Sequence, residues 1–217
     1  MGKYKGIIFD LDGTLLDTIQ DISDSANEVL TLYGYPNFTY DEYKLKVGNG
    51  LRNLFENSVP KGTDNQVLEE AYKLFLESYD KNYQNKTLPY EGIEEMLDEI
   101  DKMGIKIGIN SNKKNDYTYK LAMKFFKSIP FVAIFGERND IPRKPNPTAT
   151  LEILKFMDFT PDEVLFIGDS KTDIITATNA GMDGMGVLWG FRSYEELNKY
   201  GAKYIVSSPK EVVNIFK

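Results

Sequence analysis

Six short apolar runs, each followed by polar residues, alternate with helical patterns along this 217-residue chain. The runs are Tyr4 to Phe9, Ile105 to Ile109, Phe131 to Phe135, Val164 to Ile167, Met185 to Leu188 and Tyr204 to Val206. Such short, continuous apolar runs are typical of strands buried on both faces, as in parallel sheets. The stretches between them carry apolar residues at helical spacing, as in Glu91 to Met103 before Gly104. The pattern therefore predicts an α/β fold, with helices on both faces of a parallel sheet.

A block of helical pattern interrupts this alternation after the first strand. It runs from Thr18 to Tyr83, and the spacing of its apolar residues predicts three helices. We expect hinges at 15–18 and 84–89, a core domain of residues 1–15 and 87–217, and a helical cap domain of residues 16–86. Ligands of open parallel sheets bind beyond the carboxyl ends of the strands. A cap hinged at that edge would therefore act as a lid.

The composition removes several catalytic routes, because the chain contains no His and no Cys. Cysteine nucleophiles, Ser-His-Asp triads and Cys/His zinc sites are excluded, which leaves carboxylates, hydroxyls, Lys, Arg and a hard metal ion. The 26 Lys and Arg against 33 Asp and Glu give a net charge of −7, which argues against nucleic acid and anionic membranes as partners. No apolar run approaches the roughly 20 residues that span a bilayer, so we expect a cytoplasmic protein, either a monomer or a small homo-oligomer.

Two aspartates follow the first predicted strand, in the sequence Asp10-Leu11-Asp12-Gly13-Thr14. Carboxylates two residues apart at a strand end can face one pocket, where one attacks a substrate while the other transfers protons. Gly13 would let the backbone approach a ligand closely. An ordinary Asp-Gly turn would explain the same residues, so this motif alone leaves both interpretations open.

Polar residues also follow the next three predicted strands. Ser111 and Asn112 offer a hydroxyl and backbone amides to a phosphate, although helix capping is the simpler explanation for them alone. Lys144 precedes Pro145 and Pro147, which would stiffen its loop, and a fixed ammonium there could neutralise a phosphate. Asp169 and Asp173 suit a hard, oxygen-loving cation. Since all four strands end at one edge of a parallel sheet, the combination favours a single phosphate and metal site over four independent caps.

The four motifs together resemble those of the haloacid dehalogenase superfamily, in the same order and across nearly the whole chain. They are Asp10 to Thr14, Ser111, Lys144 and Gly168 to Asp173. The resemblance implies a Rossmann-like, doubly wound parallel sheet with an α-helical cap inserted after the first strand. The dehalogenase and phosphonate-cleaving branches differ at the position of Asp12, so this chain looks like a phosphotransferase.

The resemblance also assigns expected roles to individual residues. Asp10 is the expected nucleophile, which forms an aspartyl-phosphate, and Asp12 is the expected acid and base. Mg²⁺ is expected on Asp10, the Asp12 backbone carbonyl and Asp169. Asp173 is expected to orient Lys144 or metal-bound water rather than to bind the metal. The expected phosphate-binding residues are Gly13, Ser111, Asn112 and Lys144.

The cap is expected to select the substrate. Asn49 and Gly50 lie in a loop before a predicted helix, and Arg52 could pair with a substrate carboxylate or second phosphate. A plain helix start with a solvated arginine explains the same residues. Thr14 is expected to hydrogen-bond near the nucleophile loop, and Asp17 to Thr18 to cap the first cap helix.

A finer resemblance connects the chain to phosphoglycolate phosphatase-like enzymes. It rests on Val47 to Leu51, Gly136 to Arg138, Arg143 to Pro145, Val187 to Arg192 and Gly201 to Val206. We therefore expect a Mg²⁺-dependent phosphomonoester hydrolase that acts on a small phosphorylated metabolite, with phosphoglycolate as the leading substrate. The alternatives are a phosphomutase resembling β-phosphoglucomutase, a pyrophosphatase and a non-catalytic phosphoacceptor signalling module.

Overall fold

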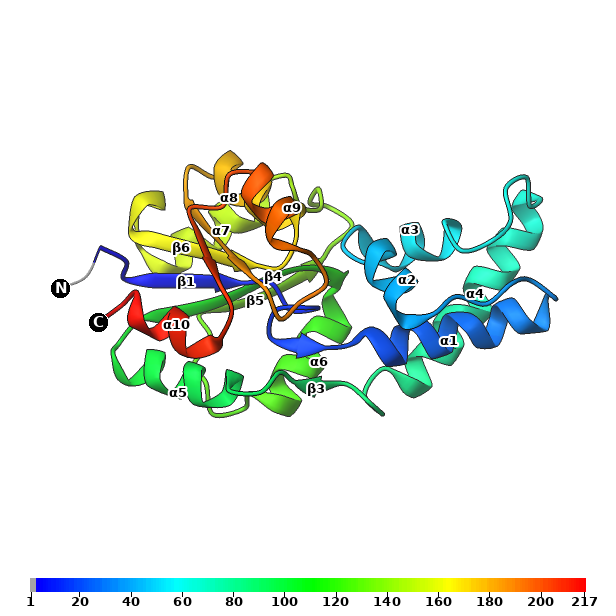
Figure 1. Ribbon diagram of the computed structural model, residues 1–217, viewed down its shortest axis with the longest axis horizontal. Helices are drawn as coiled ribbons and strands as arrows, with labels where there is room; N and C mark the ends of the chain where they lie inside the picture. Colours follow the sequence, from blue (N-terminus) through cyan, green and yellow to red (C-terminus); the bar gives the residue numbers. More distant parts are fainter. Residues whose placement is uncertain (1–2) are drawn as a thin grey trace.

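The computed structural model describes residues 3–217 and joins six strands in one parallel sheet (Figure 1). The strands are β1 (Gly6–Phe9), β4 (Lys106–Lys114), β5 (Ala133–Glu137), β6 (Val164–Gly168), β7 (Asp183–Val187) and β8 (Tyr204–Val206). They lie in the order β5-β4-β1-β6-β7-β8, and each neighbouring pair is parallel. The sequence-based prediction of a doubly wound α/β sheet is confirmed.

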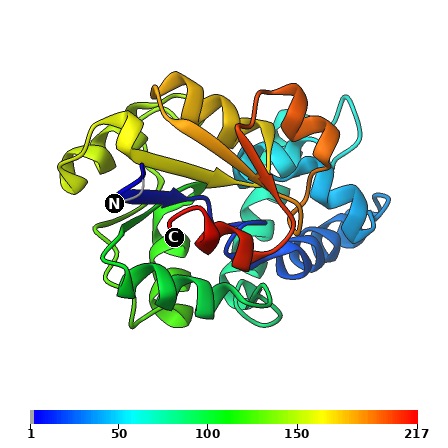
Figure 2. The same cartoon turned by 60° about the vertical axis from the view of Figure 1, so that its left-hand side comes forward.

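Helices cover both faces of this sheet, and β1 shows how the faces are divided. The core helices are α5 (Ile93–Lys102), α6 (Asn115–Phe125), α7 (Thr148–Met157), α8 (Lys171–Asn179), α9 (Tyr194–Lys199) and α10 (Pro209–Asn214). Ile7 and Phe9 pack in one cluster with α5, α6 and α10, whereas Ile8 packs in the other with α7 and α8. Figures 1 and 2 show the two helical layers on opposite sides of the sheet. Because successive strand residues face opposite sides, burial on both sides requires the continuous apolar run of β1.

Four helices lie together beyond the carboxyl end of β1, on the right of Figure 1. They are α1 (Ile19–Leu32), α2 (Tyr40–Lys46), α3 (Gly50–Glu56) and α4 (Asn65–Asn82). The chain enters and leaves this group through β2 (Leu16–Asp17) and β3 (Leu88–Pro89), which pair antiparallel. The prediction of three helices was wrong, because α2 has seven residues and only Tyr43 among them is buried. Within residues 3–217, no helix is long and apolar enough to cross a membrane.

The register of the central strands brings the polar motifs together. Phe9 in β1 lies between Ile109 in β4 and Ile167 in β6, so the residues that follow all three reach one edge of the sheet. Strand β4 continues to Lys114, although the sequence analysis ends it at Ile109. The polar side chains after Ile109 had suggested a loop, yet they belong to the strand. Ser111 therefore projects from a strand and not from a strand-to-helix turn.

Candidate active site

The loop after β1 packs so closely against its neighbours that its glycine has no room for a side chain. Gly13 has a φ of +84°, and a Cβ there would lie 2.5 Å from Asp169 Oδ2. The backbone amide of Asp10 donates to the Ile167 carbonyl at 2.9 Å, which fixes the start of the loop to β6. Gly13 therefore has a packing role. Its amide donates to the Leu16 carbonyl at 2.9 Å, so the phosphate contact predicted for this amide is not supported.

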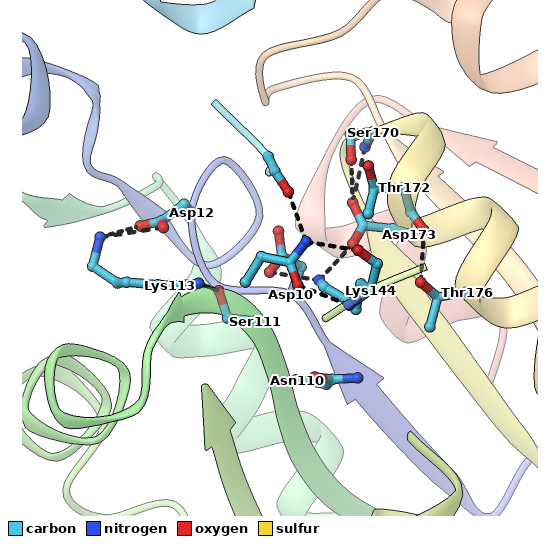
Figure 3. A network of polar contacts seen from close by, with 12 residues as sticks. Asp10, Asp12, Asn110, Ser111, Lys113, Lys144, Ser170, Thr172, Asp173 and Thr176 are labelled. Carbon is cyan, nitrogen blue, oxygen red and sulfur yellow. Dashed lines mark hydrogen bonds and ion pairs between the residues drawn. The ribbon is translucent and has the colours of Figure 1, made fainter. Parts of the chain in front are cut away.

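Lys144 links the first and fourth motifs, as Figure 3 shows. Its Nζ lies 2.9 Å from Asp10 Oδ1 and 2.7 Å from Asp173 Oδ1, and its side chain is 2% exposed. Asn112 holds the backbone of Lys144 on both sides. Asn112 Oδ1 accepts from the Lys144 amide at 2.9 Å, and Asn112 Nδ2 donates to the Lys144 carbonyl at 3.0 Å. The Asn112 side chain is thus a positioning group, and its predicted phosphate contact is left to its backbone amide.

Three buried carboxylates gather at this edge of the sheet. One oxygen each of Asp10, Asp169 and Asp173 lies within 4.8 Å of the others. Burial raises the pKa of Asp10 to about 7, because it outweighs the opposing effect of Lys144. Burial, with the charges of Asp173 and Asp10, likewise raises the pKa of Asp169 well above its usual range. Such crowded carboxylate oxygens are the ligand set that a hard divalent cation favours, so the residues present fit Mg²⁺.

The carboxylates of this cluster have different hydrogen-bond partners. Asp173 Oδ1 faces Lys144, while its Oδ2 accepts from the amide and hydroxyl of Ser170 at 3.1 and 2.7 Å. Asp169 Oδ2 accepts from the Phe191 amide at 2.7 Å. Both Asp173 oxygens thus have protein partners, which suits the predicted role of orienting Lys144 better than a role as metal ligand. Asp10 and Asp169 are the more suitable ligands.

The side chain of Asp12 faces a different partner, Lys113, which the sequence analysis had given no role. Lys113 Nζ lies 2.9 Å from Asp12 Oδ1 and 3.2 Å from Oδ2, away from the cluster around Asp10 (Figure 3). Burial is the largest single effect and lowers the pKa of Lys113, but Asp12 and Tyr79 together outweigh it and raise this pKa above its usual value. Lys113 lies two residues beyond Ser111, and residues two apart in a strand point to the same face. This spacing would have placed Lys113 beside Ser111 at the site if the predicted strand had extended to Lys114.

The cap supplies an apolar wall to the pocket that holds these groups. Asp10, Asp12, Ser111, Lys144 and Asp169 all line the pocket from the core. The cap residues that line it are Ile22, Val47, Gly48, Gly50, Leu51 and Leu54. Among the predicted cap residues, Gly50 therefore reaches the pocket, whereas the Asn49 carbonyl accepts a hydrogen bond from Arg143 at 2.8 Å.

The structure does not support a substrate contact by Arg52. The guanidinium group of Arg52 bonds Glu69 at 2.6 and 2.8 Å and Glu56 at 2.5 Å. It lies 4.8 Å from the Tyr72 ring centroid and lines a separate groove. Glu56 and Glu69 neutralise Arg52 at a groove separate from the pocket, which favours the alternative interpretation of an arginine without a substrate role.

Two smaller predictions concern Thr14 and the start of α1. The Thr14 amide donates to the Leu11 carbonyl at 3.3 Å, so this residue does hydrogen-bond within the nucleophile loop, through its backbone. The Thr14 hydroxyl is buried and has no hydrogen-bond partner among residues 3–217. Its backbone carbonyl instead accepts from Trp189 Nε1 at 2.9 Å. Thr18 is the N-cap residue of α1, but its side chain makes no cap bond. The neighbouring Asp17 Oδ1 accepts from the Ile19 amide at 3.3 Å instead.

Similar proteins match this chain over almost its whole length. A phosphoglycolate phosphatase of Aquifex aeolicus is 30% identical over 209 residues, which cover 96% of this chain and 95% of the relative. One from Psychrobacter arcticus is 28% identical over 200 residues, which cover 89% of this chain and 87% of the relative. A crystal structure from Lactobacillus delbrueckii subsp. bulgaricus, provisionally assigned as a phosphoglycolate phosphatase, superposes with a TM-score of 0.90 at 32% identity and 98% coverage of both chains.

A family model adds the last piece of evidence. The model, described as haloacid dehalogenase-like hydrolase, matches residues 7–187. That range contains Asp10, Ser111, Lys144 and Asp169, the residues that meet at the edge of the sheet. The chain therefore belongs to the haloacid dehalogenase-like hydrolases, in their phosphoglycolate phosphatase-like branch.

Proposed function

We propose that this hydrolase is a Mg²⁺-dependent phosphomonoesterase that works through an aspartyl-phosphate. The observation that carries the proposal is the contact of Lys144 with both Asp10 and Asp173, beside Asp169. The Lys144 ammonium group is thereby held beside the carboxylates of Asp10 and Asp173. A phosphoryl group needs such compensating charges around its oxygens during transfer.

In the first step, an Asp10 carboxylate oxygen attacks phosphorus and the bond from phosphorus to the ester oxygen breaks. Asp12, which lines the same pocket, gives its proton to the departing alkoxide, and the alcohol leaves. In the second step, Asp12 takes a proton from water as the water oxygen attacks phosphorus. The bond to Asp10 breaks, which releases inorganic phosphate and restores the Asp10 carboxylate.

The remaining polar groups would bind and orient the phosphoryl group and the cation. Lys144 and Ser111 would hold phosphoryl oxygens together with the amide of Asn112. Asp10, the Asp12 carbonyl and Asp169 would hold Mg²⁺. When bound, the cation supplies positive charge that offsets the repulsion between the carboxylates and the phosphate. Lys113 counters the charge of Asp12 from within the protein.

We propose phosphoglycolate as the substrate, since phosphoglycolate phosphatases of similar length are the relatives of this chain. We also propose that residues 16–86 act as a cap domain over a core of residues 1–15 and 87–217. The position of α1 to α4 beyond the catalytic edge supports this division. The cap residues that line the pocket are apolar or glycine, so they offer the leaving group no charged side chain.

The decisive experiment measures phosphate release from phosphoglycolate, sugar phosphates, nucleotides and pyrophosphate, each with Mg²⁺ and with excess chelator. We expect phosphoglycolate to be hydrolysed fastest and the chelator to stop release. An isomerised sugar phosphate as the main product would assign a mutase, and preference for pyrophosphate would assign a pyrophosphatase. A protein that accumulates stable phosphate on Asp10 without turnover would favour a signalling role.

A further inference from the structure

Core side chains bind the backbone of one short segment of the cap, residues 44–49. The acceptors are the carbonyls of Lys44, Leu45 and Val47 for Arg192, of Gly48 for Asn112, and of Asn49 for Arg143. Arg192 thus supplies three of these five bonds, and its side chain is only 11% exposed. This arginine is the principal connection between the core and the segment.

The chemistry of a helix end explains why an arginine suits this position. Lys44 and Leu45 lie in the last turn of α2, and Val47 follows that helix. The last carbonyls of a helix have no partner within the helix and need donors from elsewhere. The planar guanidinium group of Arg192 donates from Nη2 to Val47 at 2.9 Å and to Leu45 at 3.4 Å, and from Nη1 to Lys44. One side chain thereby satisfies three acceptors at once.

On the core side, Arg192 is held beside the catalytic edge. The amide of the preceding residue, Phe191, donates to Asp169 Oδ2 at 2.7 Å. A Cβ on Gly190 would lie 2.3 Å from the Gly13 carbonyl, so this loop packs directly on the nucleophile loop. Arg192 Nε also lies 3.5 Å from Glu196 Oε1 in α9. The arginine therefore has a fixed place relative to Asp169 as well as to the cap.

We propose that Arg192 is a positioning residue for the reaction, because it holds the end of α2 and the cap wall that follows it over the pocket. This inference rests on the proposed phosphomonoesterase function. Val47, Gly50 and Leu51 lie on that wall. Arg192 also lines the pocket, but its guanidinium nitrogens are bonded to the carbonyls of the cap segment and lie near Glu196. When Arg192 is lost, the wall moves away from the leaving group, whereas Lys144 and Ser111 are unchanged. Binding of the substrate should then suffer more than the chemical step.

Amide hydrogen exchange tests the connection without any substrate. The full chain is compared with Arg192→Ala and Arg192→Lys, without metal. We expect exchange in residues 44–57 to be about tenfold or more faster in R192A, since bonds from a charged donor are lost. R192K should be intermediate, because an ammonium group has no planar fork. If R192A fails to fold by circular dichroism, R192K alone decides. Wild-type exchange of this segment in the folded variants would overturn the proposal.

Steady-state kinetics on phosphoglycolate with Mg²⁺ provide the second measurement. We expect R192A to raise KM about tenfold and to change kcat by less than about threefold. Arg138→Ala is the matched control, because Arg138 pairs with Glu152 at 2.6 Å and lies over Phe135, all within the core. R138A should leave exchange in residues 44–57 unchanged. If the wild type hydrolyses no ester, the proposed function fails, but the exchange experiment still decides whether Arg192 holds the cap.

Discussion

Asp10 destabilises the metal-free protein because its carboxylate is buried beside two others. Its pKa is about 7 in the folded chain, whereas an unperturbed Asp has a pKa of about 3.9. The folded state therefore binds a proton on Asp10 more tightly than the unfolded state does. Stability contributed by the protonated form is fully present below about pH 4 and is lost as the pH rises to about 7.

Asp10→Asn should remove this pH-dependent loss of stability, and it should also abolish turnover. At pH 8 without metal, we expect the variant to be more stable than the wild type by on the order of 1 kcal/mol, with Lys144 still paired to Asp173. The difference should shrink toward pH 4, where Asp10 is protonated in the folded chain and about half protonated in the unfolded chain. Thermal unfolding from pH 4 to 8 in chelator measures it. A variant that is less stable at pH 8, or that retains turnover with Mg²⁺, would contradict the assignment.

Lys113 is the other charged group whose removal should be informative. Its side chain is fully buried against Asp12, so Lys113→Met leaves that carboxylate without its neutralising partner. We expect kcat to fall by at least about tenfold, with a smaller change in KM, because Asp12 acts in proton transfer. Lys114→Met is the control, since Lys114 lines a separate groove. Equal kcat for K113M and the wild type would show that Asp12 does not need this partner.

At the residue scale, sequence reasoning found the motif residues because their types and order are distinctive. Asp10, Ser111, Lys144 and Asp169 line one pocket. It did not find Lys113, because a lysine is identified as buried only once its strand and its partner are known. The pairing of Lys113 with Asp12 joins residues 101 positions apart, and no local pattern contains that information.

At the scale of the elements, Arg52 connects α3 to α4 through its bonds to Glu69. Arg52→Ala removes the bonds to Glu56 and Glu69, whose side chains are 41% and 63% exposed. Exposed pairs contribute about 0.2–1 kcal/mol, so we expect a loss of stability below about 1 kcal/mol. Both kcat and KM for phosphoglycolate should stay within about twofold of the wild type.

Denaturant unfolding and steady-state kinetics measure these two effects of Arg52. Glu69→Gln is a suitable companion, since it removes a partner of Arg52 and does not line the pocket. It should reproduce part of the stability change, with normal kinetics. A tenfold rise in KM for R52A alone would restore the substrate role that its sequence position suggests.

The elements that sequence reasoning missed share a physical cause. Helix α2 has one buried residue, Tyr43, so its apolar periodicity is too weak to be detected. Its start instead has a capping box from Thr39 and Glu42, a signal that is independent of burial. Strand β4 carries polar residues beyond Ile109, although its burial continues through Lys113. Polar residues in a buried strand are the exception that a functional site introduces.

At the scale of the whole molecule, the alternation of strands and helices and its interruption after β1 are visible in the sequence. The contacts of residues 44–49 with the core are not visible in it, because they join core side chains to distant backbone carbonyls. Arg192 meets the Lys44 carbonyl across 148 positions, and any residue type at position 44 would offer the same carbonyl. The contact of Arg192 with residues 44–47 is therefore a property of the folded chain alone.

The acidic cluster also makes the stability of the whole protein depend on a cation. A ligand that binds only the folded state stabilises it by about 2.7 kcal/mol at 100 times its dissociation constant. For a chain of this length we expect saturating Mg²⁺ to raise Tm by several degrees, at about 2–4 °C per kcal/mol. Asp169→Asn should lose most of that increase, because it removes a proposed ligand next to Asp10. Asp183→Asn is the control, since Asp183 pairs with Lys203 at 2.8 Å away from the pocket. Thermal unfolding with Mg²⁺ and with chelator measures the increase, and an equal increase in D169N and the wild type would exclude Asp169 as a ligand.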